Sequence, residues 1–442
     1  MAVPTSLRSR LQTGVAWNLL GSFFNQGSTF AVNIIVANLL GRQVFGEYAM
    51  IQSTIVTLSN VAQLAVGYTT TKYVAEFRSA DKAKTGRILG LCTVVSAATA
   101  CVAALALSVG ARWLAAETLQ APQLTSGLMI AAGVVLFTVM NGYQMGALAG
   151  LESYPALGVA GILSGSLYLG ICALTAWAGG LNGVLAGLVA SAVIQWGVLS
   201  WFLRRESARQ MIAIDYRGVV QERAILLKFA LPAAIGGSST MSALWLANTF
   251  LVRQPGGYEQ MALYSAANNF RVIVLFLPNI VNNVGLSLLN NQKGLEDEGR
   301  YQKVFWVNLA LTAGVAICGA AGVALLGPVV LGMFGRSFSE GYPVLLVLML
   351  STFPEALWYV LANSLASHDK FWLLLYTGIL PRDACIALLA YLLSPSFGAM
   401  GVASGYAISW VASFILVMVL VWQTGLRAVA HGTHLQGVNN AV

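Results

Sequence analysis

The sequence predicts an all-α polytopic membrane protein with about twelve transmembrane helices, arranged as two six-helix lobes related by a parallel repeat. Of the 442 residues, 57% are hydrophobic and only 9% are charged, whereas soluble domains carry roughly 25% charged residues. The 45 glycines also agree with helices packed in lipid, where glycine is commoner than in soluble helices. This composition excludes a cytosolic enzyme, a nucleic-acid-binding module and a disordered protein.

Twelve apolar stretches are long enough to cross a bilayer, whose hydrocarbon core takes about 20 residues of helix. They cover residues 12–40, 44–71, 88–110, 124–148, 157–178, 182–203, 226–250, 261–288, 304–331, 343–366, 371–393 and 398–423. The connection 204–225 mixes charged and apolar residues, so we expect a short helix along the membrane interface there. It separates an N-terminal lobe (1–203) from a C-terminal lobe (226–423), which a tail (424–442) follows.

The distribution of positive charge sets the orientation of these helices. Eighteen of the 24 lysines and arginines fall in one alternating set of connections and termini, and only Arg42, Arg112, Arg253 and Arg336 fall in the other set. Lysine and arginine concentrate on the cytoplasmic side of membrane proteins. We therefore expect both termini in the cytoplasm. Contact with anionic lipid accounts for the net charge of +8, so nucleic acid is not an expected partner.

Short motifs repeat between the two lobes. Residues 180–187 and 398–405 share the pattern GxxGVxxG at an offset of 218. Gly-Ile-Leu recurs at 161 and 378, and Ala37-Asn38 with Arg42-Gln43 resembles Ala247-Asn248 with Arg253-Gln254. Because each lobe has an even number of helices, both lobes begin on the same side of the membrane. Transporters built from such repeats bind their substrate between the repeats.

Four predicted helices carry polar side chains along one face. These are Asn18, Ser22, Asn25, Thr29 and Asn33; Gln52, Ser59, Gln63 and Thr70; Ser238, Ser242, Trp245 and Thr249; and Tyr264, Asn268, Arg271, Asn279 and Asn282. Polar groups in hydrocarbon need partners, so the four faces should look toward protein or water. For any single amide, a bridge between neighbouring helices is the favoured interpretation. Taken together, the four faces favour a hydrated cavity.

Four charged residues lie deep within predicted spans: Arg271, Glu355, Arg382 and Asp383. A charge at a helix centre costs about 2.5–3.5 kcal/mol on insertion scales, which makes each one a functional candidate. A structural network of ion pairs is the competing interpretation, and the two are compatible. Adjacent side chains diverge by about 100° on a helix. We therefore expect that Arg382 and Asp383 cannot both point at one spot, and that at least one of them needs a partner from another helix.

An ordered series of motifs over residues 12–423 resembles one transporter family. The first lobe contributes WNLLGSFFNQGSTFAVNIIVANLLGRQVFGEYAMIQ and NVAQLAVGYTTTKYVAEF. The second contributes KFALPAAIG, ALYSAANNF, FGRSFSEGYPVLLVLML, LANSLASHDKFW and GAMGVASGYAISW. The series resembles the polysaccharide-export flippases, including the O-antigen and capsule translocases, of the multidrug/oligosaccharidyl-lipid/polysaccharide exporter superfamily.

The resemblance implies transport and not catalysis. It implies movement of an undecaprenyl-diphosphate-linked oligosaccharide, a repeat unit of O-antigen, capsule or exopolysaccharide, from the cytoplasmic to the periplasmic leaflet of the inner membrane. Alternating access between the lobes is the implied mechanism. The implied partners are this substrate, membrane lipid, and the polymerase and chain-length proteins of the same export pathway. No cofactor or metal is expected, because the five cysteines form no CxxC and have no histidine nearby.

The resemblance also suggests roles for the candidate residues. Arg271 and Arg382 would bind the diphosphate, because a guanidinium matches phosphate geometry. Glu355 and Asp383 would neutralise these arginines in the empty protein or carry a coupling proton. The amides that would bind sugar hydroxyls are Asn25, Gln63, Asn268 and Asn279.

Two other functions stay open at this point. A drug or metabolite antiporter of the same superfamily would favour acidic cavity residues that bind cations. Among the four charges deep within the predicted spans, arginines and acids are equal in number, which favours an anionic substrate. A membrane-embedded polysaccharide polymerase or glycosyltransferase would need a substantial extramembrane loop with acid and base residues. The predicted outer loops are short, which disfavours that class.

Overall fold

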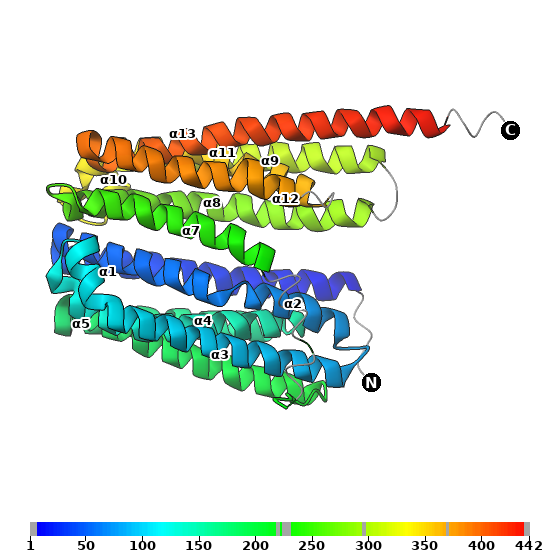
Figure 1. The fold of residues 1–442 in the computed structure, drawn as a ribbon, viewed down its shortest axis with the longest axis horizontal. Helices are drawn as coiled ribbons and strands as arrows, with labels where there is room; N and C mark the ends of the chain where they lie inside the picture. Colours follow the sequence, from blue (N-terminus) through cyan, green and yellow to red (C-terminus); the bar gives the residue numbers. More distant parts are fainter. Residues whose placement is uncertain (1–6, 218–221, 223–230, 294–297, 368–370, 437–442) are drawn as a thin grey trace. The chain divides into compact units, whose positions relative to one another are not determined.

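The structure is a computed structural model that describes residues 7–217, 222, 231–293, 298–367 and 371–436. These residues are almost entirely helical, and the helices of each part lie alongside one another (Figure 1). Eight helical runs within the described residues are long and apolar enough to cross a membrane. The chain is therefore an all-α, multi-pass membrane protein, as the composition predicts.

The long helices follow each other with short connections. They are α1 (Leu7–Gln63), α3 (Lys82–Trp113), α4 (Thr125–Gly150), α5 (Tyr154–Arg209), α7 (Leu231–Val252), α8 (Gly257–Lys293), α9 (Glu298–Leu325), α11 (Tyr342–Ser367) and α13 (Leu380–Gln436). Shorter helices are α2 (Val66–Phe77), α10 (Gly327–Gly332) and α12 (Phe371–Leu374). One π-helical segment, Leu114–Thr118, follows α3, and another, Leu375–Ile379, precedes α13.

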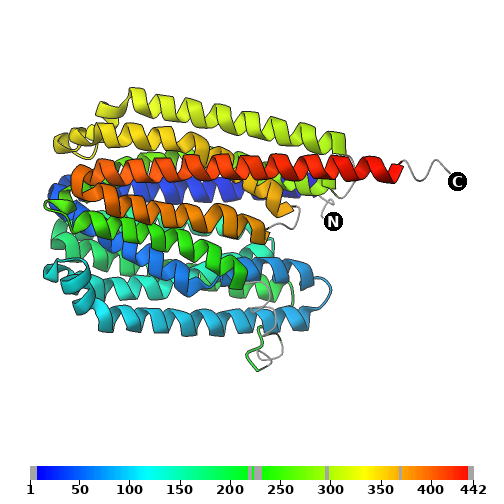
Figure 2. The same ribbon diagram turned by 45° about the horizontal axis from the view of Figure 1, so that its top comes forward.

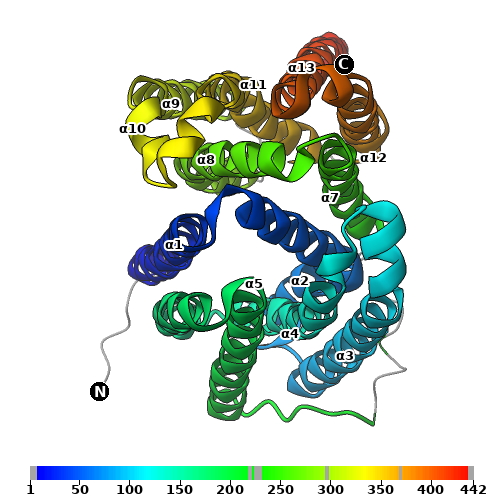
Figure 3. The same cartoon turned by 90° about the vertical axis from the view of Figure 1, so that its left-hand side faces the viewer.

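Three of the long helices are each divided by one non-helical glycine. These residues are Gly41 in α1, Gly180 in α5 and Gly398 in α13, and all three have positive φ. Residues with a side chain rarely adopt such a conformation, whereas glycine does so at little cost. Figure 3 shows the two limbs of α1 as separate helices. Nine long helices with three breaks give twelve long helical segments in the described part of the chain, which is the predicted number of spans.

The GxxGVxxG repeat has the same local structure in both places. Gly180 has φ 57° and ψ −140°, and Gly398 has φ 54° and ψ −130°. Three residues later, a Cβ on Gly183 would overlap the carbonyl of Thr175, and a Cβ on Gly401 would overlap that of Leu393. Thr175 and Leu393 are themselves 218 residues apart. In both places, the missing side chains allow the two limbs of a hairpin to touch through their backbones.

Gly398→Ala is expected to destabilise the protein by about 1–3 kcal/mol, because the backbone conformation at Gly398 is essentially restricted to glycine. The expected result is a lower midpoint of thermal unfolding for the purified protein. Gly322→Ala is the matched control, since Gly322 lies within α9 and a Cβ there meets nothing within 4 Å. Equal midpoints for Gly398→Ala and the wild type would contradict this account of the hairpin.

By its contacts the chain forms two compact units, Met1–Ala262 and Leu263–Val442. Unit 1 has a core between α2, α3, α4 and α5 that includes Val74, Leu89, Tyr143, Leu148 and Leu199. Unit 2 contains a smaller buried cluster on α8, α9 and α11, formed by Leu275, Ala316 and Ala356. Within unit 2, the C-terminal end of α13 extends past the other helices of that unit (Figure 2).

The connection after α5 differs from the sequence prediction. The interfacial helix expected at 204–225 is absent from its described residues, because α5 continues to Arg209 and residues 210–217 are irregular. The N–H of Asp215 donates to the carbonyl of Gly86 on α3 at 3.1 Å. A Cβ on Gly86 or Gly90 would overlap the backbone of this segment. Two glycines on α3 therefore let the chain lie directly on that helix. Residues 218–221 and 223–225 lie outside the described part.

The second predicted span is also interrupted. Leu64 and Ala65 have positive φ, so the helix ends at Gln63 and α2 begins at Val66. Both residues are apolar, and hydropathy alone therefore predicts a continuous span over 44–71. The break sits beside a close approach of two helices, since a Cβ on Gly67 would overlap the carbonyl of Gly142 on α4. A backbone bend accompanies the tight contact between these helices, and the residue types at the bend do not predict it.

Candidate functional site

Three of the charged and polar candidates meet in unit 2 around Arg271 of α8. One terminal nitrogen of Arg271, Nη1, lies 2.8 and 2.6 Å from the two carboxylate oxygens of Glu355 on α11. The Nε of Arg271 donates to Asn268 at 2.8 Å. Tyr406 of α13 completes the group, because its hydroxyl accepts from Arg271 Nη1 and donates to Glu355 at 2.9 Å. We call Asn268, Arg271, Glu355 and Tyr406 the Arg271 cluster.

Local helix structure helps to bring the groups of the Arg271 cluster together. Asn268 and Arg271 stand three residues apart, which puts them on one face of α8. Glu355 follows Pro354 inside α11. Proline removes a backbone hydrogen bond and disturbs the helix at that point. Arg271 is 8% exposed and Glu355 is 4% exposed, so the ion pair is sheltered from solvent.

Arg382 and Asp383 form a second buried pair. Nη2 and Nε of Arg382 lie 2.7 and 3.0 Å from Oδ1 of Asp383. The guanidinium also lies 4.2 Å from the ring centre of Trp410 and 5.0 Å from that of Trp358. We call Trp358, Arg382, Asp383 and Trp410 the Arg382 cluster. Arg382 and Asp383 pair although adjacent side chains start in diverging directions, because the long arginine side chain can curve back along its own helix.

Aromatic rings join the two clusters. The rings of Tyr406 and Trp410 are 6.0 Å apart, and those of Trp358 and Trp410 are 5.5 Å apart. Trp358 donates to the hydroxyl of Ser413 at 2.9 Å, and that hydroxyl donates to the carbonyl of Gly378 at 3.0 Å. Gly378 belongs to the π-helical segment before α13, and such segments are frequent at functional sites. The two clusters therefore form one continuous site in unit 2.

Tyr406, Trp358 and Trp410 are members of this site that the sequence reasoning missed. Their spacing carried a signal, since Glu355 and Trp358 stand three apart and Tyr406 and Trp410 stand four apart. Such spacings place side chains on one helical face. The aromatic rings matter because a buried guanidinium is stabilised over a ring face, and this is strongest over tryptophan.

The site balances its charges. Two arginines face two carboxylates, and breaking a buried pair by removing one partner is strongly destabilising because it leaves an uncompensated charge. Pairing therefore accounts for how these residues are tolerated within apolar helices. Arg271 keeps one further donor, because its Nη2 makes no hydrogen bond to any residue that the structure describes. An anion could use this donor without first displacing Glu355.

The remaining polar candidates lie in different surroundings. Asn25 on α1 and Asn279 on α8 are exposed. Gln63, at the end of α1, is half-buried with its amide against Gly142 of α4. Asn282 is buried and receives a hydrogen bond from Asn308 of α9 at 3.4 Å, so it bridges two helices. Nothing in these contacts brings Asn25 and Gln63 together with the Arg271 cluster.

Within unit 1, the second and seventh predicted spans contact each other through polar side chains. Trp245 of α7 donates to Thr54 of α1 at 3.0 Å, and Asn248 donates to Ser53 at 2.9 Å. These contacts join α7, which follows the predicted linker, to the helices that precede it. Among the described residues, no group of three His, Cys, Asp or Glu side chains could hold a metal ion.

Comparison with known proteins identifies the family. The sequence profile of the family described as "Polysaccharide biosynthesis protein" matches residues 11–284, which is more than half of the chain. The chain belongs to this family. The two charged clusters therefore belong to a member of the polysaccharide biosynthesis family.

Two curated relatives are similar along most of this family member. One is the "EPS I polysaccharide export inner membrane protein EpsE" of Ralstonia nicotianae, which is 23% identical over 372 residues that cover 84% of each chain. The protein of the same name from Ralstonia solanacearum is 21% identical over 353 residues, or 79% of each chain. The family member is thus similar to polysaccharide export proteins of the membrane.

Solved structures show the same fold. An inward-facing multidrug resistance transporter of the MATE family, in the MOP superfamily, superimposes with a TM-score of 0.78 at 13% identity and covers 93% of this chain and 98% of its own. The lipid II flippase MurJ in an inward closed conformation gives a TM-score of 0.72 at 12% identity, with 91% and 87% coverage. The polysaccharide biosynthesis protein therefore has the fold of MOP-superfamily transporters.

Proposed function

We propose that this protein is a flippase that moves an undecaprenyl-diphosphate-linked oligosaccharide from the cytoplasmic to the periplasmic leaflet of the inner membrane. The observation that carries the proposal is the match of residues 11–284 to the polysaccharide biosynthesis family. The name of the Ralstonia relatives, a polysaccharide export inner membrane protein, supports both the cargo class and the membrane. The transporter fold supports movement of a substrate and not its chemical conversion.

The chemistry of such a substrate suits the site in unit 2. Its diphosphate is anionic, its glycan is rich in hydroxyl groups, and its long lipid tail is apolar. In this proposal the free Nη2 of Arg271 makes the first contact with the diphosphate, and charge-assisted hydrogen bonds of this kind are among the stronger ones in proteins. Arg382, held between two tryptophan rings, is the second cation of the site. Asn268 and Asn279 on α8 offer amides to the sugars.

The carboxylates give the site a means of release. Glu355 competes with the diphosphate for Arg271, and Asp383 competes for Arg382. When the substrate leaves, each arginine regains its carboxylate, so the empty site carries no uncompensated charge. A proton bound to either carboxylate would weaken this competition and favour substrate binding. Alternating access between the two sequence lobes then carries the head group across the bilayer, while the tail stays in lipid.

The decisive experiment is a leaflet-resolved assay of lipid-linked oligosaccharide in cells depleted of this protein. Complete repeat units are expected to accumulate on the cytoplasmic face, and re-expression of the wild-type chain should clear them. Normal delivery of single units with failed chain growth would indicate a polymerase instead. Unchanged oligosaccharide together with altered resistance to cationic drugs would indicate an antiporter.

Arg271→Lys tests the role of the guanidinium in this proposal. Lysine keeps the charge opposite Glu355, but it lacks the planar fork that matches phosphate geometry. We expect a normal level of folded protein and about tenfold slower flipping, as the loss of roughly 1.4 kcal/mol of interaction would give. Arg336→Lys, at an exposed arginine outside the site, is the control. Equal flipping rates in both variants would remove Arg271 from the substrate site.

A further inference from the structure

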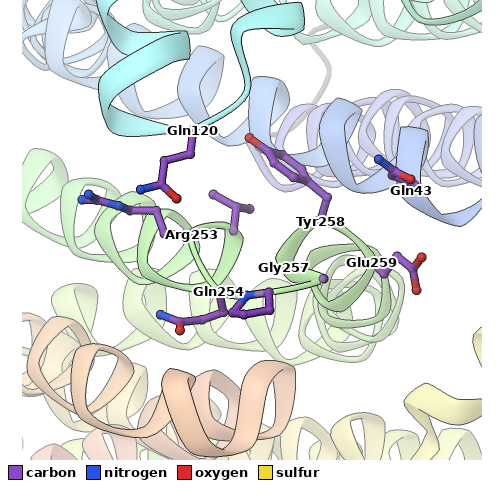
Figure 4. Close-up of a pocket in the computed structure, with 10 residues that line it drawn as sticks. Gln43, Gln120, Arg253, Gln254, Gly257, Tyr258 and Glu259 are labelled. Carbon is purple, nitrogen blue, oxygen red and sulfur yellow. The ribbon is translucent and has the colours of Figure 1, made fainter.

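A polar cavity of about 470 Å³ lies in unit 1, away from the two charged clusters. Gln43, Gln120 and residues 252–259 line it (Figure 4). The volume falls within the range of about 300–1,000 Å³ that is usual for small-molecule sites. The lining comes from the break in α1, from the segment after α3 and from the turn between α7 and α8. By the distribution of positive charge, these three connections belong to the outer, periplasmic side.

Specific contacts hold these connections together. Nε of Arg42 lies 3.4 Å from the carbonyl oxygen of Glu259 and 3.8 Å from a carboxylate oxygen of that residue. Tyr258 donates from its hydroxyl to the carbonyl of Leu119 at 3.0 Å. Gly46 lies so close to α8 that a Cβ would overlap the carbonyl of Tyr258. The cavity is therefore a built feature and not a gap between loosely placed loops.

The lining offers hydrogen bonds without a net charge. Gln43, Gln120 and Gln254 each carry an amide, and Arg253 and Glu259 contribute one charge of each sign. The side chains of Gln43, Gln120 and Arg253 make no hydrogen bond to the described residues, so their polar atoms are available to a ligand. Figure 4 shows Gln120 reaching from the segment after α3 toward Arg253 of the α7–α8 turn.

We propose that this cavity binds an uncharged saccharide: the glycan of the exported substrate after it reaches the outer side. The inference rests on the proposed flippase function for the source of the glycan. Its chemical basis is independent, because sugar hydroxyls donate and accept hydrogen bonds, as side-chain amides do. The apolar side chains of Val252 and Pro255 provide a surface for the carbon faces of a sugar ring.

The position of the cavity gives binding a consequence for transport. Gln43 belongs to the first sequence lobe, and residues 252–259 belong to the second, at positions that the repeat relates to each other. A glycan bound between them stabilises the arrangement in which these outer ends touch. Ligand that binds only one arrangement favours it by a factor of 1 + [L]/Kd. Glycan that accumulates on the outer side therefore slows the next outward opening, so the transported product inhibits further transport.

The test measures binding of free, lipid-free saccharides to the full-length protein in nanodiscs by saturation-transfer NMR. The probes are maltose, N,N′-diacetylchitobiose and the neutral oligosaccharide released by mild acid from the polysaccharide of the same cells, with inorganic pyrophosphate as the anionic comparison. Arg253→Ala and Gln120→Ala remove two lining side chains. Arg112→Ala is the matched control, since Arg112 is exposed at the end of α3 in the same unit and does not line the cavity.

The expected result is saturable binding of at least one probe, weakened about tenfold or more in both cavity variants and unchanged in Arg112→Ala. Absence of saturable binding, equal binding in all variants, or preferential binding of inorganic pyrophosphate at the same residues would overturn the proposal. Binding does not require transport, so the result stands whichever way the leaflet assay turns out. In proteoliposomes that flip the substrate, the bound saccharide on the outer side should slow flipping by wild type and not by Arg253→Ala. Equal slowing of both proteins would overturn the proposed product inhibition.

Discussion

Glu355→Ala is expected to lower the thermal unfolding midpoint of the purified protein sharply and to abolish export. The substitution leaves the guanidinium of Arg271 buried without its carboxylate and takes the acceptor from Tyr406. Breaking a buried ion pair by removing one partner costs about 3–5 kcal/mol. The folded fraction can be followed by size-exclusion chromatography after heating in detergent, and export by the leaflet-resolved assay.

The double variant separates the structural role of the pair from its functional role. Arg271→Ala with Glu355→Ala removes both charges, so it should be more stable than the sum of the two single losses predicts. Export should not recover in the double variant, because the proposed substrate-binding guanidinium is gone. Asn279→Ala, at an exposed position on the same helix, should change stability by no more than about 0.5 kcal/mol. Strictly additive losses would show that Arg271 and Glu355 are not energetically coupled.

Gly46→Val is expected to have the second large effect. Gly46 lies against the backbone of the first turn of α8, where any side chain would overlap the carbonyl of Tyr258. A rigid backbone cannot give way as a flexible side chain does. Inserting extra carbon into a packed contact costs about 1–3 kcal/mol even where the neighbours are side chains. We expect a loss of at least this size, together with easier protease cleavage in the connection between α7 and α8.

Gly27→Ala, in the same helix, is the control variant, and we expect it not to lower the stability of the protein. A Cβ on Gly27 meets nothing within 4 Å, and Gly27 lies in a helical limb of α1. Alanine is favoured over glycine inside a helix by up to about 1 kcal/mol, so this variant should be neutral or slightly more stable. If Gly46→Val and Gly27→Ala unfold at the same temperature, the close contact between α1 and α8 does not contribute to stability.

Much of the fold could be predicted from the sequence, because apolar length and glycine position are local properties. The breaks at Gly41 and Gly180 fall in gaps between predicted spans, and the break at Gly398 falls at the first residue of the last predicted span. The two hairpin glycines of the GxxGVxxG repeat share a backbone conformation, as an internal repeat requires. The break at Leu64 and Ala65 could not be predicted, because it accompanies packing against another helix and not a change in residue type.

The candidate site was predicted in part. Arg271, Glu355, Arg382 and Asp383 stood out because a charge inside an apolar span is costly. Their pairing did not follow from the sequence, and the contact of Arg382 with Asp383 could not be read from an ideal helical wheel, which ignores the length of the arginine side chain. Tyr406 and Trp410 carry no charge, so only their spacing of four residues distinguished them from the other aromatic residues of the chain.

The sequence by itself determined the membrane class, the number of spans, the internal repeat and which few charges lie within the helices. Each of these depends on residues that are close along the chain. Only the tertiary structure decided which groups meet, because Arg271 contacts Glu355 across 84 residues and Tyr406 across 135. The same holds for the outer cavity, whose lining comes from three connections far apart in sequence. Helix packing brings such residues together, and periodicity along one helix carries no information about the neighbour that its face will meet.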